Sequence, residues 1–246
     1  MYIHLIRIPI KKLLKILARA LLGLGILLLF TYAVLYVLCH EPRPELEASF
    51  EADMLANKML KAVGNEAYKN TRYLEWSFRN GAHQFLWDKT KGVAQVTWSN
   101  KKVVLDLNDT AKSMAYQNTG LVRGDRAEKL IKKATALFNN DSFWLVAPFK
   151  VFDPGTQRGV VLMEDGSRGL LVTYSSGGDT PGDTYLWKLR QDGFPESYQM
   201  WVSIIPIGGV EASWDDWQVV DSGAFLPKSH ELGPITLDMG AVKGYN

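Results

Sequence analysis

The side chains that could support acid–base or metal chemistry in this chain are few. Such a site needs two or three histidines, cysteines or carboxylates held together, and Cys39 is the single cysteine. The spacing of the candidates matches no known ligand set, and hydrogen-bonded histidines and solvated turn carboxylates explain them better. We therefore predict no metal and no cofactor. The candidates are His83, Asp88, Asp215, Asp216, His230 and Glu231.

The serine and glycine motifs do not predict catalysis either. Residues 175–178 read Ser-Ser-Gly-Gly, which lacks the Gly-x-Ser-x-Gly pattern of a nucleophile elbow. The glycine-rich loop at 177–182 holds no lysine and precedes a predicted strand, so it differs from a phosphate-binding loop. Paired carboxylates of the glycosidase kind stay an open alternative, because any acidic β domain holds candidates. We predict that the protein is not an enzyme.

Aromatic side chains are the most prominent group in the chain. All eight tryptophans lie at or after position 76. On alternating strands, one set of aromatic residues would share a face and, with two from a following helix, could line an apolar ligand pocket. A packed core between a sheet and its helices explains the same residues, and both interpretations stay open. The candidate ligand-binding residues are Trp76, Phe78, Phe85, Trp87, Trp98, Phe143 and Trp144.

The hydrophobic period predicts the elements that carry these residues. Apolar residues recur at helical spacing over 47–64 and 125–139, and Asp141 with Ser142 is expected to cap a short helix at 143–149. From residue 71 to 119 the period is two and hairpin signals recur, which predicts four or five antiparallel strands. Further strands are predicted at 160–163, 169–175, 183–190, 198–205, 210–220 and 224–227.

This order of elements predicts an α+β, mostly β domain. Runs of antiparallel strands with the helices set apart are typical of that class. A sheet of about ten twisted strands tends to curl rather than to stay flat. We therefore expect a curled antiparallel sheet, an open half-barrel, with the helices on its concave face and one transmembrane helix before it.

That transmembrane helix is predicted from an uncharged apolar segment. Residues 20–39 are long enough, at about 1.5 Å per residue, to span the core of a bilayer. Basic residues and no acids precede them, which predicts a cytoplasmic N-terminus. We expect a basic cytoplasmic segment at 1–19, a signal anchor at 20–39, a stalk at 40–46 and a periplasmic domain at 47–246. A cleaved signal peptide and lipidation of Cys39 stay open alternatives.

The charge of the exported part bears on its partners. Five of the 28 Lys and Arg precede residue 41, whereas all 26 Asp and Glu lie from residue 41 onward, which leaves that part with a net charge of about −3. A weakly acidic domain without a basic run argues against a nucleic-acid partner. The membrane and an apolar ligand are the expected partners.

Three stretches resemble a known family. They are WSFRNGAHQFLWD at 76–88, DSFWLVAPFKVFDPGT at 141–156 and MWVSIIPIGGVEASWDDWQ at 200–218. Together with the element order over 47–246, they resemble the lipoprotein-carrier superfamily of Gram-negative envelopes and uncharacterised envelope proteins of Bacteroidetes-like bacteria. The resemblance implies an unclosed half-barrel whose helices cover a cavity for acyl chains. The retained apolar helix departs from those carriers, which have a cleaved signal or a lipidated cysteine.

These observations lead to one functional expectation and one alternative. We expect a single-pass protein of a bacterial inner membrane whose periplasmic domain reversibly binds a lipid, acyl chain or other apolar ligand without catalysis. The alternative is an envelope interaction protein that docks a protein partner through a sheet edge or an aromatic patch.

Overall fold

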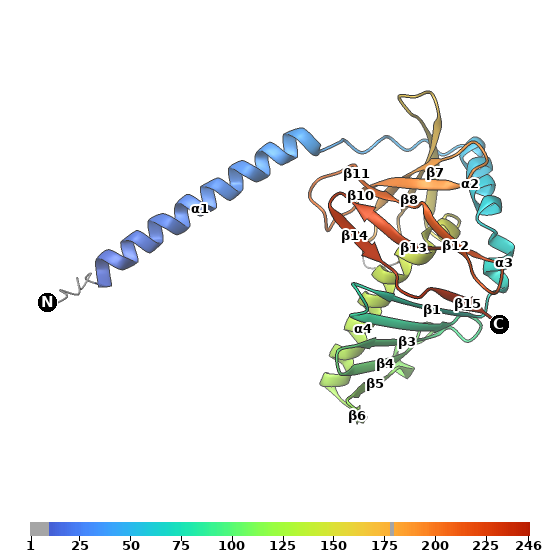
Figure 1. The fold of residues 1–246 in the computed structure, drawn as a ribbon, viewed down its shortest axis with the longest axis horizontal. Helices are drawn as coiled ribbons and strands as arrows, with labels where there is room; N and C mark the ends of the chain where they lie inside the picture. Colours follow the sequence, from blue (N-terminus) through green and yellow to red (C-terminus); the bar gives the residue numbers. More distant parts are fainter. Residues whose placement is uncertain (1–9, 178–179) are drawn as a thin grey trace, which may run out of the picture.

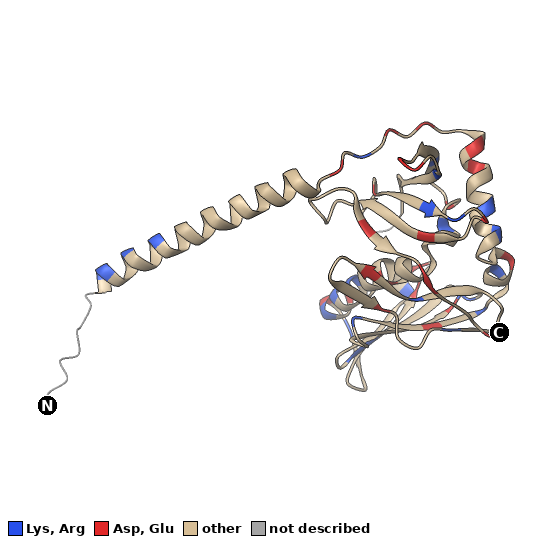
Figure 2. Cartoon of the chain, turned by 45° about the horizontal axis from the view of Figure 1, so that its top comes forward, with Lys and Arg blue, Asp and Glu red and all other residues tan. Residues whose placement is uncertain are grey.

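The fold begins with one long helix that stands clear of the domain. The structure, a computed structural model, describes residues 10–177 and 180–246. Helix α1 (Ile10–Cys39) buries none of its side chains, and its charged residues lie near its N-terminal end (Figures 1 and 2). It is long and apolar enough to cross a membrane, a property that N-terminal signal sequences share. Residues 1–9 of the predicted basic segment and 178–179 of the glycine-rich loop lie outside the described residues.

Two short helices connect α1 to the first sheet. Residues 40–49 run in extended form to α2 (Phe50–Ala62), and α3 (Asn65–Asn70) follows. Ser49 starts α2, because its hydroxyl accepts a hydrogen bond at 3.2 Å from the N–H of Ala52, which has no helical partner. The helix therefore begins three residues later than the sequence predicted.

The first sheet has seven antiparallel strands. Its members are β1 (Tyr73–Phe78), β2 (His83–Asp88), β3 (Val93–Trp98), β4 (Lys101–Asp106), β5 (Met114–Gln117), β6 (Gly120–Val122) and β15 (Lys243–Tyr245), with a 3-10 turn, η1 (Thr110–Lys112), before β5. The order β15-β1-β2-β3-β4-β5-β6 confirms the predicted meander and adds the C-terminal strand at one edge. Strands β6 and β15 were not predicted, because three residues are too short to display a period.

One continuous helix, α4 (Asp125–Val146), leads from this sheet into a 3-10 turn, η2 (Ala147–Lys150). The sequence predicted two helices here, with Asp141 as the cap of the second, and that prediction is wrong. The Asp141 carboxylate instead lies 2.7 Å from the ring of His83 on β2, so it does not cap a new helix and α4 continues through it. One side of α4 contacts β3, β4 and β5.

Two smaller antiparallel sheets complete the domain. The strands are β7 (Thr156–Leu162), β8 (Arg168–Tyr174), β9 (Thr184–Leu189), β10 (Pro195–Trp201), β11 (Val210–Ser213), β12 (Asp216–Val219), β13 (Phe225–Leu232) and β14 (Ile235–Asp238). The sheet orders are β11-β10-β9-β8-β7 and β12-β13-β14. The single strand predicted over 210–220 is divided between the two sheets, because the chain breaks its pairing at Trp214, which is fully buried.

The hydrophobic core consists of two clusters. The first lies between the seven-stranded sheet and α4, and the second lies between the five-stranded sheet, α2 and η2. The protein is therefore α+β with mostly antiparallel sheets, as predicted, and the sheets are not closed. Hydrogen bonding divides the strands into three sheets where the sequence predicted one.

Candidate functional site

The register of the first sheet brings the predicted strand aromatics onto one face. Trp76 pairs with Phe85, and His83 lies opposite both Phe78 and Trp98. Directly opposed residues on antiparallel strands project to the same side of the sheet. Trp87 extends this row, since it pairs with Leu74 and Ala94 on the same face.

Helix α4 covers this aromatic face. Phe138 packs edge-on against Trp87, with ring centroids 5.3 Å apart, and lies 6.1 Å from Trp76. Trp76 and Phe85 are stacked at 4.6 Å, and both are buried. In this conformation the face is a closely packed core, with Trp87 only partly buried. We name the layer between α4 and this face the aromatic seam.

The two predicted helical aromatics lie in other surroundings. Phe143 packs against Tyr185 at 4.9 Å and Tyr174 at 5.4 Å, in the second cluster. Trp144 contacts both clusters and lies 5.7 Å from Tyr198. The structure therefore does not bring all seven predicted residues into one pocket. It adds aromatic residues of β8, β9 and β10 that the sequence analysis did not single out, although the predicted strands there contained them.

Several polar atoms of these aromatic side chains are buried without a hydrogen-bond partner. Among the described residues, the indole N–H groups of Trp76, Trp87 and Trp187 and the hydroxyl of Tyr174 contact no acceptor or donor. Buried donors in folded proteins are nearly always paired, because a donor without a partner loses its hydration and gains nothing. The unpaired atoms lie in both clusters, so the seam under α4 and the second cluster at the C-terminal end of α4 both offer donors to a group with acceptor oxygens.

A buried histidine–carboxylate hydrogen bond joins α4 to the sheet. The Nδ1 atom of His83 lies 2.7 Å from Oδ2 of Asp141, and the side chain of Asp141 is only 2% exposed. Asn140 donates a second hydrogen bond to the same carboxylate at 2.9 Å. Burial raises the pKa of the Asp141 carboxyl above its ordinary value, although both hydrogen bonds oppose this shift. The position of α4 is thus coupled to a titratable pair.

The other candidate acid–base residues do not lie together, and each makes its own local contacts. His230 is buried, and its two ring nitrogens each lie 2.7 Å from a backbone carbonyl oxygen, those of Ser213 and Trp144. Burial lowers the pKa of His230. Asp88 pairs with Arg72 at 3.1 Å. Over residues 10–177 and 180–246, no three His, Cys, Asp or Glu residues are grouped as metal ligands.

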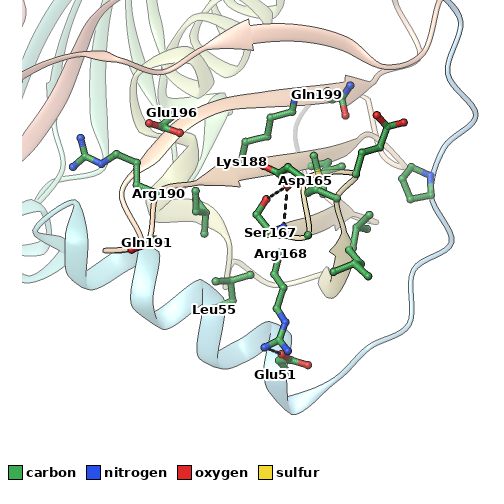
Figure 3. Close-up of a pocket in the computed structure, with 18 of the residues that line it drawn as sticks. Glu51, Leu55, Asp165, Ser167, Arg168, Lys188, Arg190, Gln191, Glu196 and Gln199 are labelled. Atoms are coloured by element: carbon green, nitrogen blue, oxygen red, sulfur yellow. Dashed lines mark hydrogen bonds and ion pairs between the residues drawn. The ribbon is translucent and has the colours of Figure 1, made fainter.

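A groove of about 1600 Å³ lies elsewhere, on the outer face of the five-stranded sheet (Figure 3). Its walls are the extended segment after α1, the exposed side of α2 and the turn between β7 and β8. Arg168 forms an ion pair with Glu51 across one end, and Asp165 accepts two hydrogen bonds from Ser167. Its apolar side chains alternate with charges of both signs, such as Glu51, Lys188 and Arg190, so an acyl chain in this groove would lie against charged groups. No local sequence signal predicted it, since its walls are distant in the chain.

No protein-family model matches the chain, and no curated protein matches it. The geometry of the described residues is therefore the basis for a functional proposal. The aromatic seam offers apolar surface with unpaired donors, whereas the outer groove offers a mixed polar surface.

Proposed function

We propose that the protein is a membrane-tethered, non-catalytic domain that binds a lipid, an acyl chain or another apolar ligand between α4 and the sheets. The observation that carries the proposal is the set of buried, unpaired donors in the two aromatic clusters that α4 contacts, one along its length and one at its C-terminal end. An apolar molecule with a few acceptor oxygens, such as an acyl ester, would bury its chain against the rings and accept these hydrogen bonds. We assign the domain to the periplasmic side of a bacterial inner membrane, because the basic end of α1 stays cytoplasmic.

The architecture proposed for this binding is an open half-barrel formed by the three sheets in series. Its support is that β11 contacts β13 and that β1 contacts β14. Hydrogen bonds also cross these junctions, from the Ser77 N–H to the Met239 carbonyl at 3.0 Å and from the Glu231 N–H on β13 to the Ser213 hydroxyl on β11 at 2.8 Å. In this arrangement α4 would lie on the concave face as a movable cover.

Binding requires α4 to move, because the aromatic seam is packed in the structure described. The outer side of α4 already carries exposed lysines, whereas outward movement would expose its apolar inner side, with Phe138 and Leu145, together with the rings of the sheet. The ligand would compensate by covering the exposed rings, at roughly 25 cal/mol per Å² of apolar surface. The His83–Asp141 pair holds α4 closed until then.

A second candidate function is the docking of a protein partner, and the outer groove favours it. Met54 and Leu162 line the groove with largely exposed apolar side chains. Their neighbours in the groove are polar or charged, and non-obligate protein interfaces likewise combine apolar contacts with a polar rim.

The test uses the full chain in vesicles that contain a lipid with a diazirine in its acyl chain. After irradiation, mass spectrometry maps the adducts along the protein. We expect adducts on β1–β3 and on the sheet-facing side of α4, in addition to those on α1. Adducts confined to α1 and its immediate surroundings would overturn lipid binding and favour the protein-docking alternative.

A matched pair of variants tests the unpaired donors. Trp76→Phe keeps an apolar ring and removes one unpaired N–H, so it should lower adduct formation by about 2- to 10-fold, the value of one hydrogen bond. The control is Trp217→Phe, because the Trp217 indole already donates to the Trp214 carbonyl. Equal adduct yields from the two variants would contradict a role for the Trp76 donor.

A further inference from the structure

The loop between β10 and β11 presents apolar side chains to the outside. Residues 200–210 contain no charged side chain. Within them, Ile204 is 70% exposed, Pro206 is exposed, and Ile205 and Ile207 are partly exposed. Ile204, Pro206 and Ile207 together make an apolar loop tip, which is unusual for a surface that contacts only water.

This loop is fastened to the end of α1. The N–H of Glu41 donates to the carbonyl of Gly208 at 3.0 Å, and the N–H of Gly208 donates to Nδ1 of His40 at 3.0 Å. The indole of Trp201 donates to the Glu41 carbonyl at 2.8 Å, and Gln199 donates to the Glu41 carboxylate at 3.0 Å. His40 and Glu41, the first residues of the predicted stalk, are therefore held against this loop.

Glycine makes this close approach possible. A Cβ atom at Gly208 would lie 2.8 Å from the Glu41 carbonyl oxygen, and one at Gly209 would lie 2.6 Å from the Glu41 Cβ. Gly209 also has a φ of 81°, which disfavours other residues. Both positions thus let the loop contact the chain directly where α1 ends.

The place of the loop relative to a bilayer follows from these contacts. If α1 spans a membrane, its last residue, Cys39, lies at the membrane–water interface, and the loop contacts the next two residues. Tyr36 stacks on His40 with ring centroids 4.3 Å apart, and Trp201 lies beside Glu41. Tyrosine and tryptophan are enriched at this depth of a membrane.

We propose that the loop 203–207 inserts Ile204 and Ile207 into the headgroup region of the bilayer that α1 spans, while Ile205 packs against the second cluster and holds the loop to the domain. The occupant is the lipid bilayer, because the loop is held at the point where the apolar helix ends. The proposal rests on the membrane anchor of the proposed function and is independent of ligand binding in the aromatic seam.

The test places one fluorescent label on the full chain in vesicles. After Cys39→Ser removes the single cysteine, Ile204→Cys carries an environment-sensitive label, and vesicles with nitroxide lipids report contact with acyl chains. The control is Val219→Cys, because Val219 is 59% exposed and lies on β12, on the side of the domain away from α1 (Figure 1). We expect the label at 204 to be blue-shifted and quenched several-fold more strongly than the label at 219.

Carbonate extraction of the same samples separates the two ways in which the proposal can fail. Equal quenching at both positions in a chain that resists extraction would overturn the loop contact and leave the anchor intact. A chain that carbonate removes from the vesicles would overturn the anchor and the loop contact together. Neither outcome depends on lipid adducts in the aromatic seam, so ligand binding is tested separately.

Discussion

Removal of the His83 imidazole should destabilise the domain more than removal of the Asp141 carboxylate. The pair joins β2 to α4 across 58 residues of sequence, at 2.7 Å. The Asp141 side chain is 2% exposed, whereas that of His83 is 14% exposed and can reach water at its edge. His83→Ala therefore leaves a buried carboxylate without its hydrogen-bond partner on β2, and Asp141→Ala leaves an imidazole that solvent can partly satisfy.

The expected magnitudes follow from this difference in burial. An unpaired buried charge costs about 3–5 kcal/mol, which we expect for His83→Ala at pH 7. Loss of an acceptor whose donor can reach water costs about 1–3 kcal/mol, which we expect for Asp141→Ala. In a domain of this size, 1 kcal/mol corresponds to about 2–4 °C in the midpoint of thermal unfolding, so His83→Ala should lower it by about 6–20 °C. The double variant should cost less than the sum of the two, by about 0.5–3 kcal/mol.

The assay is thermal unfolding of the full chain in detergent, followed by tryptophan fluorescence. All tryptophans lie at or after position 76, so the signal reports the domain and not α1. Burial raises the pKa of Asp141 above its ordinary 3.8. The protonated carboxyl therefore stabilises the fold below about pH 3.8, and this contribution is lost as pH rises through the raised pKa. The cost of His83→Ala should accordingly be smaller near pH 4 than at pH 7.

A matched control changes the same residue type on the same helix. Asp125 is exposed in the first turn of α4, so Asp125→Ala should cost at most about 1 kcal/mol. If the costs of His83→Ala and Asp141→Ala add to within about 0.5 kcal/mol, the two side chains do not interact in solution. A cost of His83→Ala that grows as pH falls toward 4 would refute the burial of a raised-pKa carboxyl.

Three further changes test other contacts. Phe138→Ala should lower the free energy of unfolding by about 3–5 kcal/mol, because it leaves a cavity at the centre of the aromatic seam. Gly208→Ala should increase cleavage of residues 40–47 by added protease, since its Cβ would meet the Glu41 carbonyl at 2.8 Å. Tyr245→Phe should speed amide hydrogen exchange in β15, because it removes the 2.6 Å bond to the Glu75 carboxylate. The Tyr245 and Lys243 contacts lower the pKa of Glu75, so the contribution of this bond is present above about pH 4.5 and is lost as pH falls through the lowered value.

Each of these changes has a control or a contradicting result. The control for Phe138→Ala is Lys132→Ala on the exposed side of α4, which should change the free energy of unfolding by less than about 0.5 kcal/mol. If Phe138→Ala lowers the free energy of unfolding no more than Lys132→Ala does, the seam is not packed. The control for Gly208→Ala is Gly120→Ala, which should leave proteolysis unchanged, because a Cβ at Gly120 would lie 3.7 Å from its nearest neighbour, the Gln117 carbonyl oxygen. Unchanged exchange in β15 after Tyr245→Phe would contradict the edge contact.

Local patterns predicted the elements of this protein well where they are long and regular. The uncharged segment at 20–39 lies within α1, and the alternation from residue 71 predicted β1 to β5. The same alternation placed Trp76, Phe85 and Trp98 on one face, because side chains of a strand alternate whatever the strand packs against.

Local patterns did not decide which partner a versatile residue takes. An aspartate can cap a helix or accept a hydrogen bond from a distant side chain, and its sequence neighbours do not distinguish the two uses. In the structure Asp141 bonds His83 and α4 continues, which turns Phe143 towards the second cluster and away from the predicted set.

The sequence alone determined the membrane-length helix, the period-two strands and the presence of many aromatic side chains, because each depends on residues a few positions apart. Tertiary structure decided what these residues contact. Three contacts join residues that are distant in the chain: Glu41 with Gly208, β15 with β1, and α4 with the aromatic face of the first sheet. Such contacts depend on how the whole domain excludes water and satisfies its buried polar groups, which no short stretch of sequence contains.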